Sequence, residues 1–172
     1  MVLNMGPLLR GEITRMDIQY ELTPEPVMDV TFPTDASVKG SITDDGGYMR
    51  LMLRATLPYK GTCARCLDEV SGEFVLDFVR TVAAEGSITE EKLAEMDDAY
   101  VMIRDGKLDV DEALREELLM CFPMRLLCSE DCEGLCDKCG RPRRLGDCGC
   151  SAKEIDPRLA ILQKWVDKSK KE

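Results

Sequence analysis

Nine cysteines and no histidine are the residues of this 172-residue chain whose types and spacing point most directly to a chemistry. Six of them lie between residues 128 and 150, two form a separate pair, and one stands alone; in chain order they are Cys63, Cys66, Cys121, Cys128, Cys132, Cys136, Cys139, Cys148 and Cys150. Thiols grouped in this way converge on a soft metal ion, usually zinc. Catalytic zinc sites commonly use histidine and keep one position open for water, whereas a site made only of thiolates is closed. The composition therefore predicts a protein that metal stabilises and in which metal performs no catalysis.

The spacing of the cysteines predicts two ions. Cys136 and Cys139 are two residues apart and are followed by Gly140, which is typical of a metal-binding knuckle, and Cys148 and Cys150 supply a second pair. Four thiols remain, at Cys63, Cys66, Cys128 and Cys132, and they complete a second set of four. We interpret both sets as structural zinc sites, with one ion and surplus thiols as the alternative. We interpret Cys121 as a small buried hydrophobic residue.

Three other chemistries fit parts of the cysteine pattern. The spacing of Cys132, Cys136 and Cys139 matches the iron–sulfur loop of radical enzymes, but only 33 residues follow Cys139, too few for the barrel that those enzymes need. A non-catalytic iron–sulfur cluster uses the same ligands and stays an alternative. A thioredoxin-like role for Cys63 and Cys66 requires a helix at the first cysteine, whereas strands are predicted on both sides. Without a histidine base, phosphate loop or nucleophile elbow, we expect no enzymatic activity and no small-molecule substrate.

Charge is distributed unevenly along the chain. The net charge is −10; residues 1–120 carry 12 Lys/Arg against 24 Asp/Glu, and residues 121–172 carry 11 against 9. Such an acidic protein is a poor non-specific binder of nucleic acid. The basic residues of the cysteine-rich loop are Lys138, Arg141, Arg143 and Arg144, and they either balance the thiolates or contact RNA phosphates. Residues 85–120, with 12 acidic side chains, form either a solvated face or a surface for a basic protein.

The N-terminal sequence and the hydropathy favour a cytoplasmic protein. No basic residue precedes the short apolar stretch of residues 1–9, as one does in a secretory signal. No apolar run approaches the roughly 20 residues needed to span a bilayer, and an odd number of cysteines fits a disulfide framework poorly. We therefore expect reduced thiols and no contact with a membrane.

Hydrophobic periodicity predicts an α+β fold. Alternating residues indicate strands over 8–22, 27–32, 37–43, 48–57, 70–82 and 100–103, with a hairpin turn at residues 44–47. A helix is predicted behind Asp109, with Leu114 and Leu118 toward the core, and Pro123 ends it. Asp156 and Pro157 begin a last helix, whose apolar stripe predicts docking onto the domain. We expect an antiparallel β domain with one packed helix at residues 1–122, and a zinc-stapled tail with a docking helix at residues 123–172.

Several motifs together resemble the YceD family, which is named for accumulation of the large ribosomal RNA subunit. They are Cys63-Ala64-Arg65-Cys66-Leu67, the helix of residues 109–120, Cys132-Glu133-Gly134-Leu135-Cys136-x2-Cys139-Gly140, and Asp156-Pro157-Arg158-Leu159-Ala160. The resemblance spans about residues 10–166. It implies a non-enzymatic role in accumulation of large-subunit ribosomal RNA, through ribosome assembly or RNA processing. The partners it implies are a large-subunit precursor, ribosomal RNA or a basic ribosomal protein; the alternative is a zinc-dependent protein-interaction module with no RNA role.

Overall fold

The computed structural model describes residues 1–87 and 100–150. By internal contacts the described residues group into two compact units, Met1–Ala64 with Asp68–Cys128, and Arg65–Leu67 with residues 129–150. The predicted acidic segment after Ser87 and the predicted C-terminal helix lie outside the described residues, and the predicted boundary at residue 122 stays a prediction. No helix in the described part of the chain is long and apolar enough to cross a bilayer.

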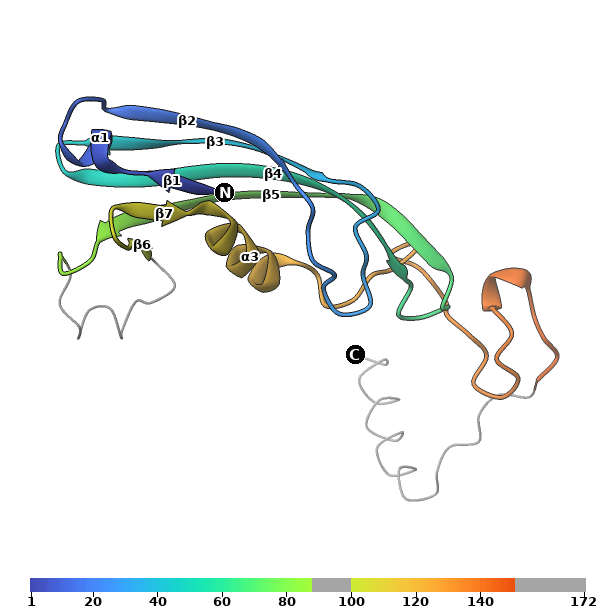
Figure 1. Ribbon diagram of the computed structural model, residues 1–172. Helices are drawn as coiled ribbons and strands as arrows, with labels where there is room; N and C mark the ends of the chain where they lie inside the picture. The colour runs from blue at the N-terminus through green and yellow to red at the C-terminus, as the bar shows by residue number, and fades with distance from the viewer. Residues whose placement is uncertain (88–99, 151–172) are drawn as a thin grey trace, which may run out of the picture. The chain divides into compact units, whose positions relative to one another are not determined.

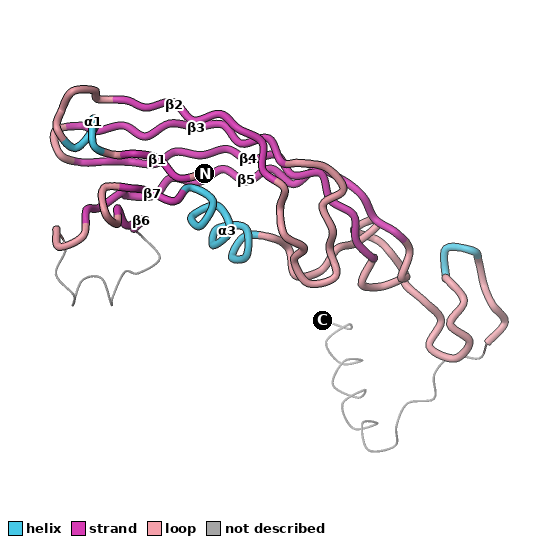
Figure 2. Tube along the Cα trace, in the orientation of Figure 1, coloured by secondary structure: helices cyan, strands magenta, loops and turns pink. Residues whose placement is uncertain are grey.

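A five-stranded sheet in the order β2-β3-β4-β5-β6 is the framework of the first unit (Figures 1 and 2). Its strands are β2 (Arg15–Leu22), β3 (Ala36–Asp45), β4 (Tyr48–Thr62), β5 (Glu69–Ala84) and β6 (Tyr100–Ile103). The first four pair antiparallel, and β6 pairs parallel to β5. The prediction of an antiparallel β domain with one helix is therefore confirmed in part, because the sheet is mixed.

Local sequence explains the central hairpin. β3 and β4 pair up to Asp45 and Tyr48, so that Gly46 and Gly47 alone form the turn. Both glycines have positive φ, at 65° and 93°, which the two-residue hairpin turn requires. The backbone N–H of Gly47 also donates to the side chain of Asp44 at 2.8 Å. The long β4–β5 hairpin that follows carries Cys63 and Cys66 in its turn.

The core lies on one face of the sheet, as the alternation of β4 predicted. Leu51, Leu53 and Ala55 are buried, whereas Arg50 and Arg54 between and beside them are exposed. Helix α3 (Val110–Cys121) covers the buried face with the side chains of Val110, Ala113, Leu114 and Leu118. Asp109 caps it by accepting hydrogen bonds from the N–H groups of residues 111 and 112, and the helix ends two residues before Pro123.

The N-terminal residues differ from the prediction. A strand was expected over residues 8–22, but the chain forms β1 (Val2–Asn4), the short helix α1 (Gly6–Leu9) and then β2. β1 pairs antiparallel with β7 (Lys107–Asp109) in a second, two-stranded sheet on the same side as α3 (Figure 1). Met5 and Leu8 are buried in the core. Residues 10–14, expected as part of the strand, are instead exposed turn and loop residues between α1 and β2.

Candidate metal centres

The segment that carries Cys128 is held along the end of β4 by apolar packing. Phe122, only 3% exposed, contacts the rings of Phe32, Tyr59 and Phe74 edge-on, with centroids 5.0–6.0 Å apart. Leu126 is buried, and it packs so closely on Gly61 that a Cβ at residue 61 would lie 2.5 Å from its side chain. These contacts fix the chain immediately before Cys128.

Two backbone N–H groups complete the approach of Cys128 to the β4–β5 turn. The N–H of Ala64 donates to the carbonyl oxygen of Leu126 at 2.8 Å. The N–H of Cys128 donates to Sγ of Cys63 at 3.4 Å. N–H groups pointing at sulfur stabilise the thiolate form that a metal ion requires. Residues 65 positions apart in sequence are thereby brought together in one unit.

The turn that holds Cys63 and Cys66 has the backbone of a metal-binding knuckle. The N–H of Cys63 donates to the carbonyl of Asp68 at 2.8 Å, which closes the turn. Leu67, directly after the second cysteine, has φ of 62°, a conformation that L side chains adopt rarely. Gly140 has the equivalent place after Cys139 in the other knuckle, with φ of 71°. The residue after the second cysteine therefore has a left-handed φ in both knuckles, and it is leucine in one and glycine in the other.

Arg65 organises the segment around Cys132. One of its nitrogens, Nη1, donates to the carbonyl oxygens of Glu130 and Cys132, each at 2.9 Å. Gly134 lies against the backbone of Arg65, because a Cβ at residue 134 would be 2.9 Å from the Arg65 carbonyl oxygen. The φ of Gly134 is also positive, at 74°. Glycine is therefore needed there for its conformation as well as for space.

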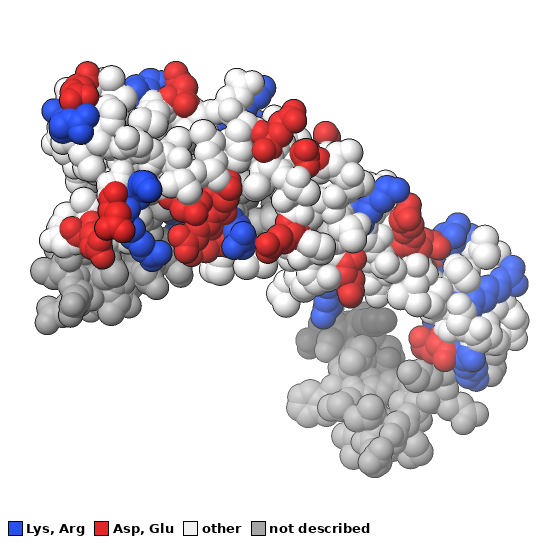
Figure 3. All heavy atoms as spheres, viewed as in Figure 1, with Lys and Arg blue, Asp and Glu red and all other residues white. Residues whose placement is uncertain are grey.

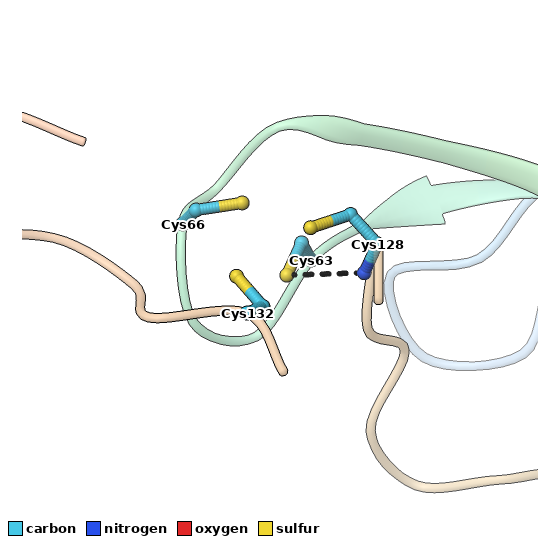
Figure 4. Close-up of side chains that lie close together, drawn as sticks. All are labelled: Cys63, Cys66, Cys128 and Cys132. Carbon is cyan, nitrogen blue, oxygen red and sulfur yellow. Dashed lines mark hydrogen bonds between the residues drawn. The ribbon is translucent and has the colours of Figure 1, made fainter. Parts of the chain in front are cut away.

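The first cluster consists of the thiols of Cys63, Cys66, Cys128 and Cys132 (Figure 4). Their Sγ atoms all lie within 4.8 Å of one another, and Figure 4 shows the four side chains pointing toward a common centre. Cys63 and Cys66 are buried, at 0% and 4% exposure. Buried thiols of this kind are shielded from solvent reagents, which suits a structural site.

The second cluster consists of the thiols of Cys136, Cys139, Cys148 and Cys150, again with all Sγ atoms within 4.8 Å of one another. A compact loop positions it: the N–H of Cys136 donates to the carbonyl of Arg141, and the N–H of Gly140 donates to that of Cys136, both at 2.9 Å. A short 3-10 turn, η2 (Arg143–Leu145), leads on to the second cysteine pair. These backbone hydrogen bonds join residues that are close in sequence.

Both sets of sulfurs fit one tetrahedral ion. Four thiolates at about 2.3 Å from a zinc ion lie about 3.8 Å from one another. Separations below 4.8 Å need only a small contraction to reach that geometry. With four thiolates no position is left for water or substrate, so such a site is structural. The two sets of four are the same sets that the cysteine spacing predicted, and the identity of the ion stays a prediction.

The second cluster contains one thiol prepared to act as a thiolate. Backbone N–H groups of Cys139 and Lys138, with help from neighbouring thiols, lower the pKa of Cys136 to about 6. Cys150 shows the opposite effect, since hydrogen bonds with the thiols of Cys148 and Cys139 raise its pKa to about 12. The loop backbone therefore favours negative charge on Cys136, whereas the surroundings of Cys150 disfavour it.

This difference predicts the order of alkylation in metal-depleted protein. At pH 7 Cys136, with a pKa of about 6, is mostly thiolate, the reactive form. The pKa of Cys121 is raised, chiefly by its hydrogen bond to Glu117. A limiting amount of iodoacetamide is therefore expected to label Cys136 before Cys121 and Cys150, as peptide mass spectrometry will measure. Cys121 is more exposed than Cys136. If Cys121 is labelled first, exposure determines the order of labelling and this expectation is wrong.

The predicted basic residues surround the second cluster. Lys138, Arg141 and Arg143 line a hollow of about 530 Å³ together with Cys136, Cys148 and Cys150. Arg144 follows in η2, and Nη2 of Arg141 donates to the carbonyl of Leu145 at 3.2 Å. Glu133, Asp137 and Asp147 also line the hollow. The structure thus gathers three of the four basic residues around one hollow, while contact with RNA stays a prediction.

The interpretation of Cys121 as buried was wrong. It is exposed at the end of α3, and its Sγ donates to Oε1 of Glu117 at 3.3 Å. Its spacing from Leu114 and Leu118 placed it on the core face, but the helix ends there, and Phe122 takes the buried position instead.

Sequence reasoning also gave no role to Arg65 or Gly134. The signal for Arg65 was its position between Cys63 and Cys66. An arginine there has five N–H donors for carbonyl groups that the metal cluster brings near.

Comparison with known proteins gives a family match. A family model described as large ribosomal RNA subunit accumulation protein YceD matches residues 51–165, which include both candidate clusters. Uncharacterized proteins of Mycobacterium bovis and Mycobacterium tuberculosis are each 32% identical over 105 residues, which cover 61% of this chain and 49% of theirs. An uncharacterized protein of Mycobacterium leprae is 31% identical over 85 residues, covering 49% of this chain and 38% of its own length.

The chain spans about half the length of these relatives at most. No solved structure matches it. The family match is nevertheless continuous through the long β4–β5 hairpin, α3 and the cysteine-rich loop, and it covers well over half of the sequence. The chain therefore belongs to the YceD family, described as large ribosomal RNA subunit accumulation proteins.

Proposed function

We propose that each of the two four-cysteine clusters binds one structural zinc ion. The support is the donor set, since eight thiols in two groups match closed tetrahedral sites and the chain contains no histidine. Elemental analysis of protein purified without chelator should find about two zinc ions per chain. If the analysis finds iron and the protein absorbs visible light, the clusters hold iron–sulfur centres and the assignment of zinc is wrong. Because thiolates must be deprotonated to bind, lowering the pH should release the metal.

The function we propose is non-enzymatic support of large-subunit ribosomal RNA accumulation, in ribosome assembly or RNA processing in the cytoplasm. The observation that carries it is the family match over residues 51–165. The distribution of charge supports it: an acidic first unit and a basic loop around the second cluster make the loop the natural place for phosphate contact. A zinc ion in the second cluster would keep that loop rigid without taking part in chemistry.

In this proposal Lys138, Arg141, Arg143 and Arg144 contact RNA phosphates. Four phosphate contacts give a slope of log affinity against log salt of about 3–4 in magnitude. Affinity for isolated RNA is then modest. Specificity must come from RNA shape or from a protein surface, because phosphate contacts carry no sequence information.

Replacement of these four residues by alanine tests the proposal. We expect the variant to lose most of its co-sedimentation with large-subunit precursors on sucrose gradients, because the phosphate contacts are removed. Zinc content should be unchanged, since none of the four supplies a thiolate. The control is alanine at Arg15, Lys39, Arg50 and Arg54, four exposed cations on the strands of the sheet. It makes the same change in net charge. Full co-sedimentation of the loop variant, or equal loss in both variants, would refute phosphate contact by the loop.

A zinc-dependent protein-interaction module without an RNA role is the second candidate. The observation that favours it is the carboxylate-rich surface of α3, which is unsuited to RNA. If nuclease treatment abolishes co-sedimentation of the protein with large-subunit precursors, the first candidate is supported. Nuclease-resistant association that the loop variant retains would support the second.

A further inference from the structure

The C-terminal half of α3 exposes large apolar side chains. Leu119 is 59% exposed and Met120 is 70% exposed, although the same helix buries Leu114 and Leu118 against the sheet. Met124, just beyond the helix, is 84% exposed. Neighbouring exposed apolar residues of this size, rimmed by charge, mark surfaces that bind other molecules. Methionine suits such a surface because its flexible side chain adapts to a partner.

A hollow lies on each side of Leu119. The smaller, about 150 Å³, lies between α3 and the β2–β3 connection, and its lining includes Leu22, Pro24, Pro26 and the buried Leu57, Leu114 and Leu118. The larger, about 330 Å³, lies between α3 and β6, and its lining includes Met102, Ala113 and Met120. Leu119 lines both, so it forms a ridge between two recesses. A partner with several apolar side chains could place one in each recess.

The rim of this surface is acidic. Glu25 and Asp111 border the smaller hollow, and Glu112 and Glu116 border the larger. Figure 3 shows carboxylates gathered over the region where α3 and the β6–β7 turn lie in Figure 1. Three arginines are interspersed. Arg80 forms a partly buried ion pair with Glu117, and Asp111 pairs with the N-terminal amine. Arg115 and Arg104 reach Glu25 and Glu112 only at 3.7 Å, and these four side chains are largely exposed. Exposed pairs of this kind are weak and are easily exchanged for a partner's cations.

Charge and apolar character together select the class of partner. Phosphates of nucleic acid and of anionic lipid are repelled by carboxylates, so neither RNA nor a membrane surface fits. A protein segment with apolar side chains on one face and lysine or arginine beside them fits both the recesses and the rim. We propose that the surface of α3 around Leu119 and Met120 binds a basic amphipathic helix of another protein.

The proposal uses none of the basic loop residues and therefore goes beyond the proposed contact with RNA. Its test uses the full-length, zinc-loaded chain and two labelled synthetic peptides of identical composition. In one peptide leucine and lysine lie on opposite faces of a helix, and in the other their order is scrambled. Fluorescence anisotropy measures binding. We expect the amphipathic peptide to bind more tightly, because only it presents contiguous apolar side chains.

Variants then locate the site. Leu119→Ser combined with Met120→Ser is expected to weaken binding about tenfold or more, as loss of central apolar anchors does. The matched control is Met52→Ser with Val79→Ser, which removes two exposed apolar side chains from paired positions of β4 and β5. Glu112→Gln with Glu116→Gln should weaken binding and reduce its dependence on salt. All six positions are exposed or at the surface, so folding should persist, which circular dichroism will check.

Four outcomes would overturn the proposal. Equal binding of the scrambled peptide would mean non-specific attraction to an acidic protein, and equal weakening by the control variant would place the peptide elsewhere. Trp165 is the only tryptophan of the chain. A red shift of its emission in the Leu119→Ser, Met120→Ser variant without peptide would mean that the chain's own C-terminal segment occupies the surface. Concentration-dependent self-association that the same variant abolishes would mean that the occupant is a second copy.

Discussion

Substitution of Cys63 by serine is expected to lower the metal content from about two ions per chain to about one. Sγ of Cys63 is fully buried, accepts the N–H of Cys128 at 3.4 Å and lies within 4.8 Å of the three other thiols of its cluster. A hydroxyl is a poor replacement for a thiolate at a soft metal site. Structural zinc contributes apparent binding free energies of about 10–16 kcal/mol in small zinc-binding domains, so the loss should be large.

Hydrogen exchange distinguishes a cross-link from a local turn. If one ion joins the four thiols, Cys63→Ser should reduce amide protection near residues 126–132 as well as near residues 62–68. Cys148→Ser is the matched control, because it also removes one ion but belongs to the other cluster. It should leave protection at residues 62–68 unchanged. Cys121→Ser should retain both ions. Protection lost only beside residue 63 in the first variant would mean that the cluster does not join the two segments.

The parts of the fold that the sequence predicted are those that local chemistry determines. Gly46 and Gly47 have the positive φ that a two-residue hairpin needs, and the turn formed where expected. Asp109 and Pro123 delimit α3 because one caps free N–H groups and the other cannot continue a helix. Pair spacing and the fourfold coordination of zinc favoured a division of eight cysteines into two sets of four without requiring it, and the structure groups the same thiols.

The pairing of strands that are distant in sequence could not be predicted from local sequence patterns. The parallel pairing of β6 with β5 has no local signal, because it depends on the path of the chain between two strands. The pairing of β1 with β7 joins residues more than 100 positions apart. Residues 8–14 were included in the expected strand, but Leu8 belongs to the short helix α1 and is buried in the core, and residues 10–14 are exposed turn and loop residues.

The same distinction applies to the candidate metal centres. The second cluster is local, since the loop hydrogen bonds that position Cys136 lie within residues 134–146. The first depends on partners distant in sequence: Arg65 donates to carbonyls 65 and 67 positions away, and Leu126 packs on Gly61. The cysteine pattern identified which thiols meet. Among the side chains that bring them together, Arg65 had a signal in the sequence, its place inside a cysteine pair. The packing of Leu126 on Gly61 could be found only from the structure, because it depends on the tertiary fold.

Among the residues that pack the segment before Cys128, Phe122 is the one whose removal should lower the free energy of unfolding most. Its ring is 3% exposed and contacts three other aromatic rings, each in an edge-on arrangement worth about 0.5–1.5 kcal/mol beyond burial. Phe122→Ala should therefore lower the free energy of unfolding by about 3–5 kcal/mol. Chemical denaturation followed by circular dichroism of the β domain measures the change.

The position of Phe122 also predicts an effect on metal. It precedes Cys128 by six residues, and with Leu126 it holds that segment along β4, so its removal should let Cys128 move away from Cys63. Chelator should then remove one ion from the variant faster than from the unaltered protein, while the second, locally built cluster releases its ion at an unchanged rate. Met124→Ala is the control: Met124 lies in the same segment but is 84% exposed, and its loss should change stability by no more than about 0.5 kcal/mol. Equal release of both ions from the Phe122 variant would mean that the aromatic cluster stabilises the β domain without positioning Cys128.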